Sequence, residues 1–184
     1  MSKIVAFLGS PRKNGYTAQL INRVLDGAKS AGADVVVYDL NAEGIKGCQG
    51  CFYCRDHEDC ATRDVLYPMY EDIKTADGIV FGSPIYFGTI TGQAKIWLDR
   101  MYPMYALDFS PRFPGKKAVT VYAQANPDDT RFIKAIETTN NFMKDYGWDI
   151  MESLLVYGNV EENYMLPEEL LDRAYEAGKA LAKA

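Results

Sequence analysis

The fold is indicated by residues 4–17, which read IVAFLGSPRKNGYT. Residues 4–8 form a continuous apolar run, as expected for a strand covered on both faces of a parallel sheet. Residues 9–17 then form a strand-to-helix turn rich in hydroxyl, amide and backbone N–H groups, with two cationic side chains. A phosphate in such a turn meets unpaired N–H groups and the positive end of a helix dipole. The stretch therefore predicts a phosphate-binding loop at the edge of an α/β sheet.

The same alternation of strand and helix patterns continues along the chain. Apolar runs are separated by stretches with apolar residues at helical spacing, which predicts a parallel sheet with helices on both faces. Right-handed crossovers leave few topologies, and we expect the strand order 2-1-3-4-5 with a ligand crevice where the first and third strands diverge. The expected strands are 4–8, 34–40, 78–82, 118–123 and 150–157, and the expected helices are 17–31, 65–76, 91–102, 130–146 and one that Pro167 opens.

Composition limits the classes of protein that fit. The 184 residues suit one domain, taken as residues 1–184, and 48% hydrophobic against 24% charged residues is typical of a globular chain. A formal net charge of −5 and the lack of a basic run argue against a nucleic-acid partner. No apolar stretch reaches the roughly 18 residues of a membrane span, and no targeting signal precedes the first strand. We therefore expect a cytoplasmic protein with no membrane partner.

Two familiar phosphate-loop patterns fail at residues 9–17. The Walker pattern needs a glycine, four residues and Gly-Lys, but Gly15 comes one residue late and Tyr16 follows it. The dinucleotide fingerprint needs a second glycine where Pro11 stands. Without that fingerprint, Asp39 at the end of the second strand is expected to be a turn residue. A hydroxyl-rich loop suits one terminal phosphate monoester better than a pyrophosphate.

A second loop follows the third strand at residues 83–92 and reads SPIYFGTITG. Pro84 and two glycines shape a tight turn, while Tyr86 and Phe87 offer flat surfaces to an aromatic ring. Backbone N–H groups in this loop are available to the polar edge of such a ring. An apolar slot with a few fixed donors is what a heteroaromatic cofactor requires.

The two loops together resemble those of the NAD(P)H-dependent FMN reductase superfamily and, within it, the iron–sulfur flavoproteins. The resemblance extends from the first strand to residue 103 and includes Thr91-Gly92-Gln93 and Asp99-Arg100. It implies a flavodoxin-like three-layer sandwich that binds FMN, and a homodimer or homotetramer with the flavin near a subunit interface. It also implies a third contact with the cofactor after the fourth strand, in a loop that varies among such proteins. By this resemblance Ser10, Arg12, Asn14 and Thr17 are expected to bind the FMN phosphate, Pro84, Ile85, Tyr86, Phe87 and Gly88 to line the isoalloxazine ring, and Gln124 and Asn126 to supply the third contact.

Residues 44–63, the cysteine loop, hold every cysteine of the chain. They are spaced Cys-x2-Cys-x2-Cys-x5-Cys within thirteen residues and can converge on one centre. The spacing resembles loops that wrap a [4Fe–4S] cluster, and the iron–sulfur flavoproteins carry it at this place in the chain, which implies a cluster beside the flavin. Unmetallated thiols or a disulfide, and a zinc site, stay open as alternatives. The four candidate ligands are Cys48, Cys51, Cys54 and Cys60, whereas His57 is expected to be a solvated loop residue.

The combined pattern favours an oxidoreductase in which NADH or NADPH delivers hydride to FMN. The electrons then pass to a small acceptor or, through a cluster, to a one-electron partner. Because the flavin carries the chemistry, no catalytic side chain is predicted. Two alternatives stay open: a non-enzymatic electron carrier of the flavodoxin type, and a flavoprotein sensor that uses its cysteines as a redox switch. The aromatic stretch 101–105, with Phe109 and Phe113, either supplies a subunit interface or packs over the sheet edge.

Overall fold

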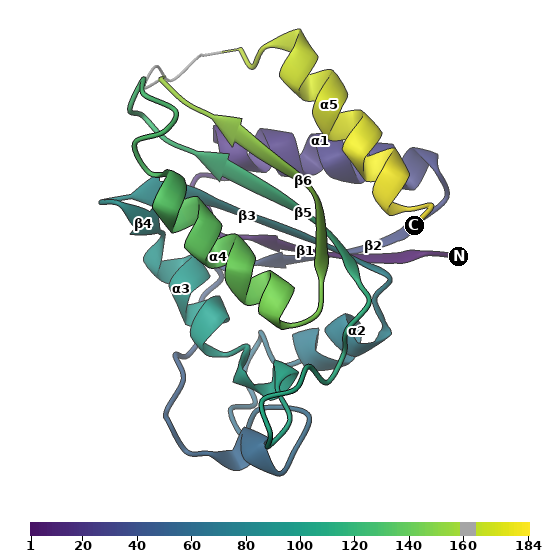
Figure 1. The fold of residues 1–184 in the computed structure, drawn as a ribbon, viewed down its shortest axis with the longest axis vertical. Coiled ribbons are helices and arrows are strands. Elements are labelled where there is room, and N and C mark those ends of the chain that lie inside the picture. The colour runs from purple at the N-terminus through teal and green to yellow at the C-terminus, as the bar shows by residue number, and fades with distance from the viewer. Residues whose placement is uncertain (159–164) are drawn as a thin grey trace.

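The computed structural model describes residues 1–158 and 165–184 and shows a three-layer arrangement, with one sheet between two layers of helices (Figure 1). The predicted α/β sandwich is confirmed. In chain order the elements are β1 (Lys3–Leu8), α1 (Tyr16–Ser30), β2 (Asp34–Asp39), η1 (Tyr53–Arg55), α2 (Met69–Thr75), β3 (Gly78–Tyr86), β4 (Thr89–Ile90), α3 (Gly92–Asp99), η2 (Tyr102–Met104), β5 (Lys117–Ala123), α4 (Ile133–Asp145), β6 (Asp149–Val156) and α5 (Glu168–Leu181).

The five long strands run parallel in the order β2-β1-β3-β5-β6, so the predicted 2-1-3-4-5 order of the apolar runs is confirmed. β1 lies between β2 and β3, which places the expected crevice at the carboxyl ends of β1 and β3. β3 continues beyond the predicted end at Gly82 and forms a hairpin with the short β4, in which Ile85 lies opposite Ile90. The sheet therefore extends further into the second loop than its apolar run suggested.

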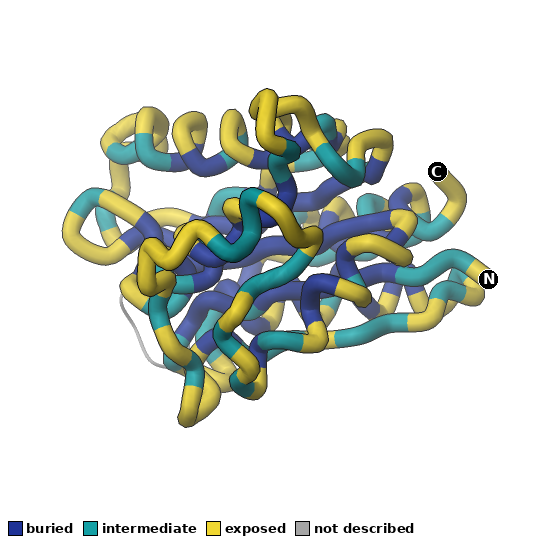
Figure 2. Tube along the Cα trace, turned by 90° about the horizontal axis from the view of Figure 1, so that it is seen from below, coloured by how far each residue is buried: buried dark blue, intermediate teal, exposed yellow. Residues whose placement is uncertain are grey.

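Successive residues of each strand pack alternately into two separate hydrophobic cores, one on each face of the sheet. Along β1, Val5 and Phe7 pack with α2, α3 and α4, whereas Ile4 and Ala6 pack with α1 and α5. This alternation follows from the period-two geometry of a strand. Figure 2 shows the result: the strands in the middle are mostly buried, and the helices alternate between buried and exposed residues. Both faces of the sheet are covered, as the continuous apolar runs predicted.

The layer made by α1 and α5 depends on two glycines. A Cβ at Gly27 would lie 2.0 Å from the Tyr175 carbonyl oxygen, and a Cβ at Gly178 would lie 1.8 Å from the Val24 carbonyl oxygen. Real Cβ atoms do not approach backbone so closely, so the two helices pack at this distance only because both positions are glycine.

Some predicted boundaries move for local reasons. The helix expected at 65–76 begins only at Met69, because the Asp64 carboxylate accepts the Leu66 N–H at 3.2 Å and residues 65–68 form turns. Gly32 ends α1 with a φ of +89°, as predicted. Among the described residues, no helix is long and apolar enough to cross a membrane.

Candidate functional site

The first two strand-end loops are hydrogen-bonded to each other at the carboxyl ends of β1 and β3. The Thr91 hydroxyl donates to the Gly9 carbonyl at 2.6 Å and accepts the Ala94 N–H at 3.2 Å, which caps α3 as predicted. The Gly9 N–H donates to the Gly82 carbonyl at 2.7 Å. Thr91 is 1% exposed, so these bonds are shielded from water. The two loops are therefore one unit that the buried Thr91 joins.

The first loop places its predicted phosphate ligands in two environments. Ser10 and Thr17 are buried, and the Ser10 hydroxyl accepts the Arg12 N–H at 3.2 Å. Arg12 and Asn14 are exposed, so their side chains are available to a ligand. α1 follows directly, with Gly15 at its N-cap, and within the described part of the chain no side chain caps it and no acid lies in its first turn. The positive end of the α1 dipole therefore meets no negative side chain of its own helix.

The second loop is a tight hairpin whose tip carries the exposed aromatic rings. Phe87 and Gly88 both have positive φ, +50° and +89°, in the turn between β3 and β4. Tyr86 and Phe87 are exposed, while Pro84 and Ile85 are buried and Ile85 belongs to the core. The two aromatic side chains thus stand free for stacking, whereas Pro84 and Ile85 shape the loop from inside.

The third loop, after β5, contains a buried amide with an unused acceptor. The Gln124 Nε2 donates to the carbonyl oxygens of Asp128 at 2.7 Å and Asn126 at 3.3 Å. Its Oε1 is buried and has no hydrogen-bond partner among the described residues. A buried acceptor without a donor is destabilising, so Oε1 is suited to a donor from a ligand. The Asn126 side chain is occupied differently, since its Oδ1 accepts the Asp128 N–H at 2.9 Å.

The three strand-end loops match the chemical parts of FMN. The basic residues of the first loop and the uncapped start of α1 suit a phosphate, and Tyr86 and Phe87 suit an aromatic ring system. The Gln124 Oε1, which has no partner among residues 1–158 and 165–184, suits a hydroxyl or ring N–H donor. The residues present therefore fit this cofactor. Asn126 is less available to it than the resemblance implied, because its Oδ1 already accepts the Asp128 N–H.

The four cysteines lie on a loop that side chains from other segments hold in place. All are free thiols: Cys48 and Cys51 are exposed, and Cys54 and Cys60 are half-buried. Burial raises the pKa of the Cys54 thiol, and the other three thiols of the loop add to this shift. Within residues 1–158 and 165–184, no three His, Cys, Asp or Glu side chains are gathered as a metal site. The donor set has the chemistry of an iron–sulfur site, but the loop would have to close further around a metal.

The cysteine loop lies away from the strand-end loops of the same chain. In Figure 1 it occupies the lower end of the molecule, while β4 and the carboxyl ends of the strands are at the left. The base of the loop is bound by Arg100, which follows the last residue of α3, whereas Thr91 precedes the first. The eight residues of α3 span about 12 Å. Within one chain α3 therefore lies between the base of the cysteine loop and Thr91, and the expectation of a cluster beside the flavin stays a prediction.

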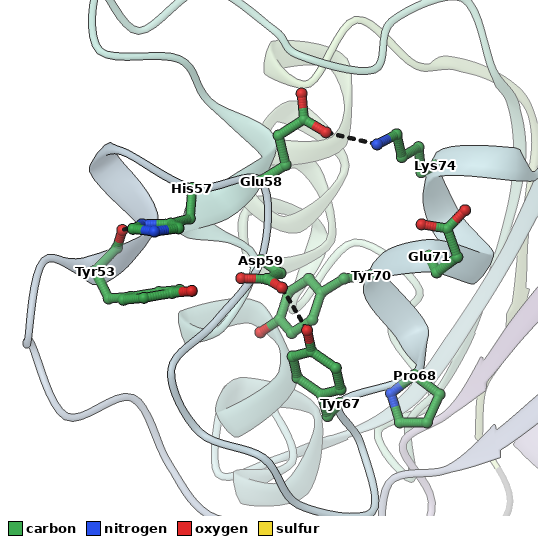
Figure 3. A pocket seen from close by; sticks show the side chains of 9 residues that line it. All are labelled: Tyr53, His57, Glu58, Asp59, Tyr67, Pro68, Tyr70, Glu71 and Lys74. Atoms are coloured by element: carbon green, nitrogen blue, oxygen red, sulfur yellow. Dashed lines mark hydrogen bonds and ion pairs between the residues drawn. The ribbon is translucent and has the colours of Figure 1, made fainter.

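A pocket of about 300 Å³ lies between the cysteine loop and α2 (Figure 3). Its polar groups mostly satisfy one another: Lys74 pairs with Glu58 at 2.6 Å, and the Tyr67 hydroxyl donates to Asp59. His57 is exposed and stacks on Tyr53, which agrees with its prediction as a solvated residue. The pocket marks where the loop is attached to α2. It is lined by Tyr53, His57, Glu58, Asp59, Tyr67, Pro68, Tyr70, Glu71 and Lys74.

Comparison with known proteins agrees with this arrangement. The family described as NADPH-dependent FMN reductase matches residues 2–130, which contain the first two strand-end loops, the cysteine loop and most of the third. The chain belongs to the NADPH-dependent FMN reductase family. The resemblance proposed from the two loops alone is thereby confirmed.

Within this FMN reductase family, the chain is similar to proteins named iron-sulfur flavoprotein. It is 30% identical to one from Methanocaldococcus jannaschii over 85% of this chain and 76% of the relative. It is 27% identical to one from Methanosarcina thermophila over 88% of this chain and 83% of the relative. A solved NAD(P)H:quinone oxidoreductase from Methanothermobacter marburgensis has the same fold, with a TM-score of 0.78, 19% identity and 98% coverage of both chains.

Several residues of this FMN reductase family member matter in ways that the sequence did not reveal. Thr91 was expected only to cap a helix, yet it also joins the second loop to Gly9 of the first, 82 residues away along the chain. Gln124 was expected as a ligand, but only the folded structure shows that its oxygen has no partner within the described part of the chain. Arg100 was part of the family resemblance with no role assigned, because the partners of its side chain lie 30 to 54 residues away along the chain.

Proposed function

We propose that this chain is an FMN-dependent oxidoreductase that takes electrons from NAD(P)H and passes them to a small acceptor. The observation that carries the proposal is the junction at Thr91, which fixes a basic strand-to-helix loop and an aromatic hairpin side by side at the switch point of the sheet. A phosphate site and a ring site at a fixed separation are what a flavin mononucleotide needs. Membership of the NADPH-dependent FMN reductase family supports the same cofactor.

In this proposal the first loop anchors the phosphate. Ser10 and Thr17 are buried at the base of the loop and offer hydroxyl donors, and Arg12 and Asn14 reach from the rim. The amides at the start of α1 add dipolar attraction for an anion. Arg12 supplies a planar fork of N–H groups, which suits a phosphate better than a point charge does.

The second and third loops hold the rest of the cofactor. Tyr86 and Phe87 provide aromatic surface for the ring, and the positive φ of Gly88 lets the hairpin turn tightly next to them. Gln124 presents its Oε1, which bonds no described residue, to a donor group of the cofactor. FMN, when bound, accepts hydride from a nicotinamide and can release electrons one at a time. The chain's own task is to hold the ring in place and leave one face open.

We further propose that the cysteine loop holds a [4Fe–4S] cluster through Cys48, Cys51, Cys54 and Cys60. Two observations support this: the four thiols lie on one loop with cluster-like spacing, and the similar proteins of M. jannaschii and M. thermophila are named iron-sulfur flavoproteins. Thiolates are the ligands that iron–sulfur clusters select. Such a cluster gives a one-electron outlet for a protein partner.

We also propose a homodimer or homotetramer. Tyr102 and Phe109 are exposed on the segment after α3, whereas Met101 and Met104 of the same stretch are buried in the core. The aromatic stretch therefore both packs inward and leaves apolar surface outside. Sedimentation of the FMN-loaded protein tests this, and a monomer at micromolar concentration would contradict it.

The experiment for the enzymatic proposal is steady-state oxidation of NADH and NADPH by the FMN-loaded protein, with a quinone, a nitro compound and ferricyanide as acceptors. Turnover with either nicotinamide is expected. FMN bound without turnover by either nicotinamide would refute the reductase proposal and favour a non-enzymatic carrier. Iron and sulfide analysis of protein purified without oxygen tests the cluster separately, and flavin bands without iron would remove it.

A further inference from the structure

One buried arginine binds both ends of the cysteine loop. Arg100 is 1% exposed, and its guanidinium donates from Nη1 to the Lys46 carbonyl at 3.2 Å and from Nη2 to the Thr62 carbonyl at 3.2 Å. These two residues stand just before the first cysteine and just after the last one. The side chain of Arg100, which belongs to neither end of the loop, therefore bonds both ends.

The position of this guanidinium is itself fixed. Arg100 Nη1 lies 2.6 Å from Asp64 Oδ2, and the two side chains are 0% and 5% exposed. Asp64 also accepts the Lys46 N–H at 2.9 Å, and the Tyr70 hydroxyl donates to the Arg100 carbonyl at 2.9 Å. A buried charge pair with its remaining polar groups satisfied holds one geometry. Asp64 and Tyr70 thus fix Arg100 in the position from which it bonds the two carbonyls.

A second arginine is hydrogen-bonded to the loop near its middle. Arg112, from the segment before β5, donates to the carbonyls of Arg55 at 3.0 Å and of His57. The loop between Lys46 and Thr62 otherwise contains little regular structure, since η1 is its single short helix in the described chain. Its shape is therefore set largely by other segments, and Arg100 closes its base together with Asp64, which accepts the Lys46 N–H.

We propose that Arg100 is the positioning residue of the cysteine loop: it holds the two ends of the loop together before any metal binds, so that less of the loop has to become ordered when the four thiols close on one inorganic centre. This role rests on the proposed cluster only in its last step, because Arg100 contacts both ends of the loop when no metal is bound. Lysine in its place can still pair with Asp64, but a single ammonium group cannot bind two separated carbonyls and a carboxylate as the planar fork does.

The test is hydrogen–deuterium exchange of the FMN-loaded, metal-free chain, comparing wild type with Arg100→Lys. Peptides spanning residues 46–62 are expected to exchange about tenfold faster in the variant, because two hydrogen bonds to a charged donor are lost. Bound FMN and exchange elsewhere should stay at the wild-type level. The matched control is Arg173→Lys, which changes an exposed arginine paired with Glu152 on the other face of the sheet. Unchanged exchange at 46–62 would overturn the proposal.

A second variant separates positioning from a general loss of stability. Arg100→Met combined with Asp64→Asn leaves no buried charge unpaired, so the chain is expected to fold and to keep FMN. It should nevertheless show the faster loop exchange and take up less than half the wild-type iron when reconstituted with iron and sulfide without oxygen. Wild-type exchange in this variant would also refute the role of Arg100. Faster exchange, with no iron uptake even by wild type, would refute the cluster and leave the positioning role intact.

Discussion

Thr91→Val is the substitution that most directly probes the junction of the two strand-end loops. Valine keeps the branched shape and the volume of threonine but lacks its hydroxyl. The change therefore removes the bond to the Gly9 carbonyl at 2.6 Å and the cap on the Ala94 N–H at 3.2 Å. Both groups lie where Thr91 is 1% exposed, so water does not readily replace the lost partner.

The magnitude follows from these two losses. Removing the cap costs about 1 kcal/mol, and leaving the buried Gly9 carbonyl without its donor costs roughly 1–3 kcal/mol. The free energy of unfolding should therefore fall by about 2–4 kcal/mol, which lowers the melting temperature by about 4–16 °C in a chain of this size. FMN affinity should fall as well, because the phosphate loop and the aromatic hairpin are no longer held together.

The assay is urea unfolding of the FMN-free chain, followed by fluorescence, with the denaturant dependence checked for an unchanged slope. Thr89→Val is the matched control, since Thr89 is an exposed threonine on β4 of the same hairpin. It should change the free energy of unfolding by less than about 0.5 kcal/mol. If Thr91→Val were as stable as Thr89→Val, the junction would not stabilise the site as argued.

Three further outcomes are expected. Gly178→Ala should destabilise the chain by at least about 2 kcal/mol in urea unfolding, because its Cβ would lie 1.8 Å from the Val24 carbonyl oxygen; wild-type stability would contradict the close packing of α1 and α5. Burial alone would raise the pKa of the Asp64 carboxyl, but hydrogen bonds from the Lys46 N–H and Arg100 lower it overall. Its contribution is therefore complete above the usual carboxyl pKa and is lost as pH falls below about 4, so the free energy of unfolding should drop more steeply there in wild type than in Asp64→Asn, and parallel curves would contradict this. Arg12→Ala should weaken FMN binding about tenfold or more by fluorescence titration, and unchanged affinity would count against the phosphate loop.

The layered fold could be predicted because its signals are local. Continuous apolar runs such as residues 4–8 mark strands covered on both faces, and Gly32 marks a helix end by its own backbone freedom. The missed extension of β3 has a local cause too, since Pro84 interrupts the apolar pattern although its ladder partner is Ala123 of β5. Asp64 likewise shortened a predicted helix, because it accepts the Leu66 N–H in a turn. Residues 65–68 could form either that turn or the first turn of the helix.

The site was predictable in its residue types and less so in its contacts. The two loops could be recognised from residues 9–17 and 83–92, but the bond from Thr91 to Gly9 depends on the strand order. The role of Arg100 depends on three segments that meet only after folding. The distance between the cysteine loop and the flavin loops depends on the direction of α3, which no spacing of cysteines encodes.

The central claim is that the three strand-end loops bind FMN through its phosphate. It is tested most directly by titrating the flavin-free chain with FMN and with riboflavin, which has the same ring system and no phosphate, and following the quenching of flavin fluorescence. We expect one FMN per chain and binding of riboflavin at least about tenfold weaker. Equal affinity for the two flavins, or no binding of FMN, would contradict it.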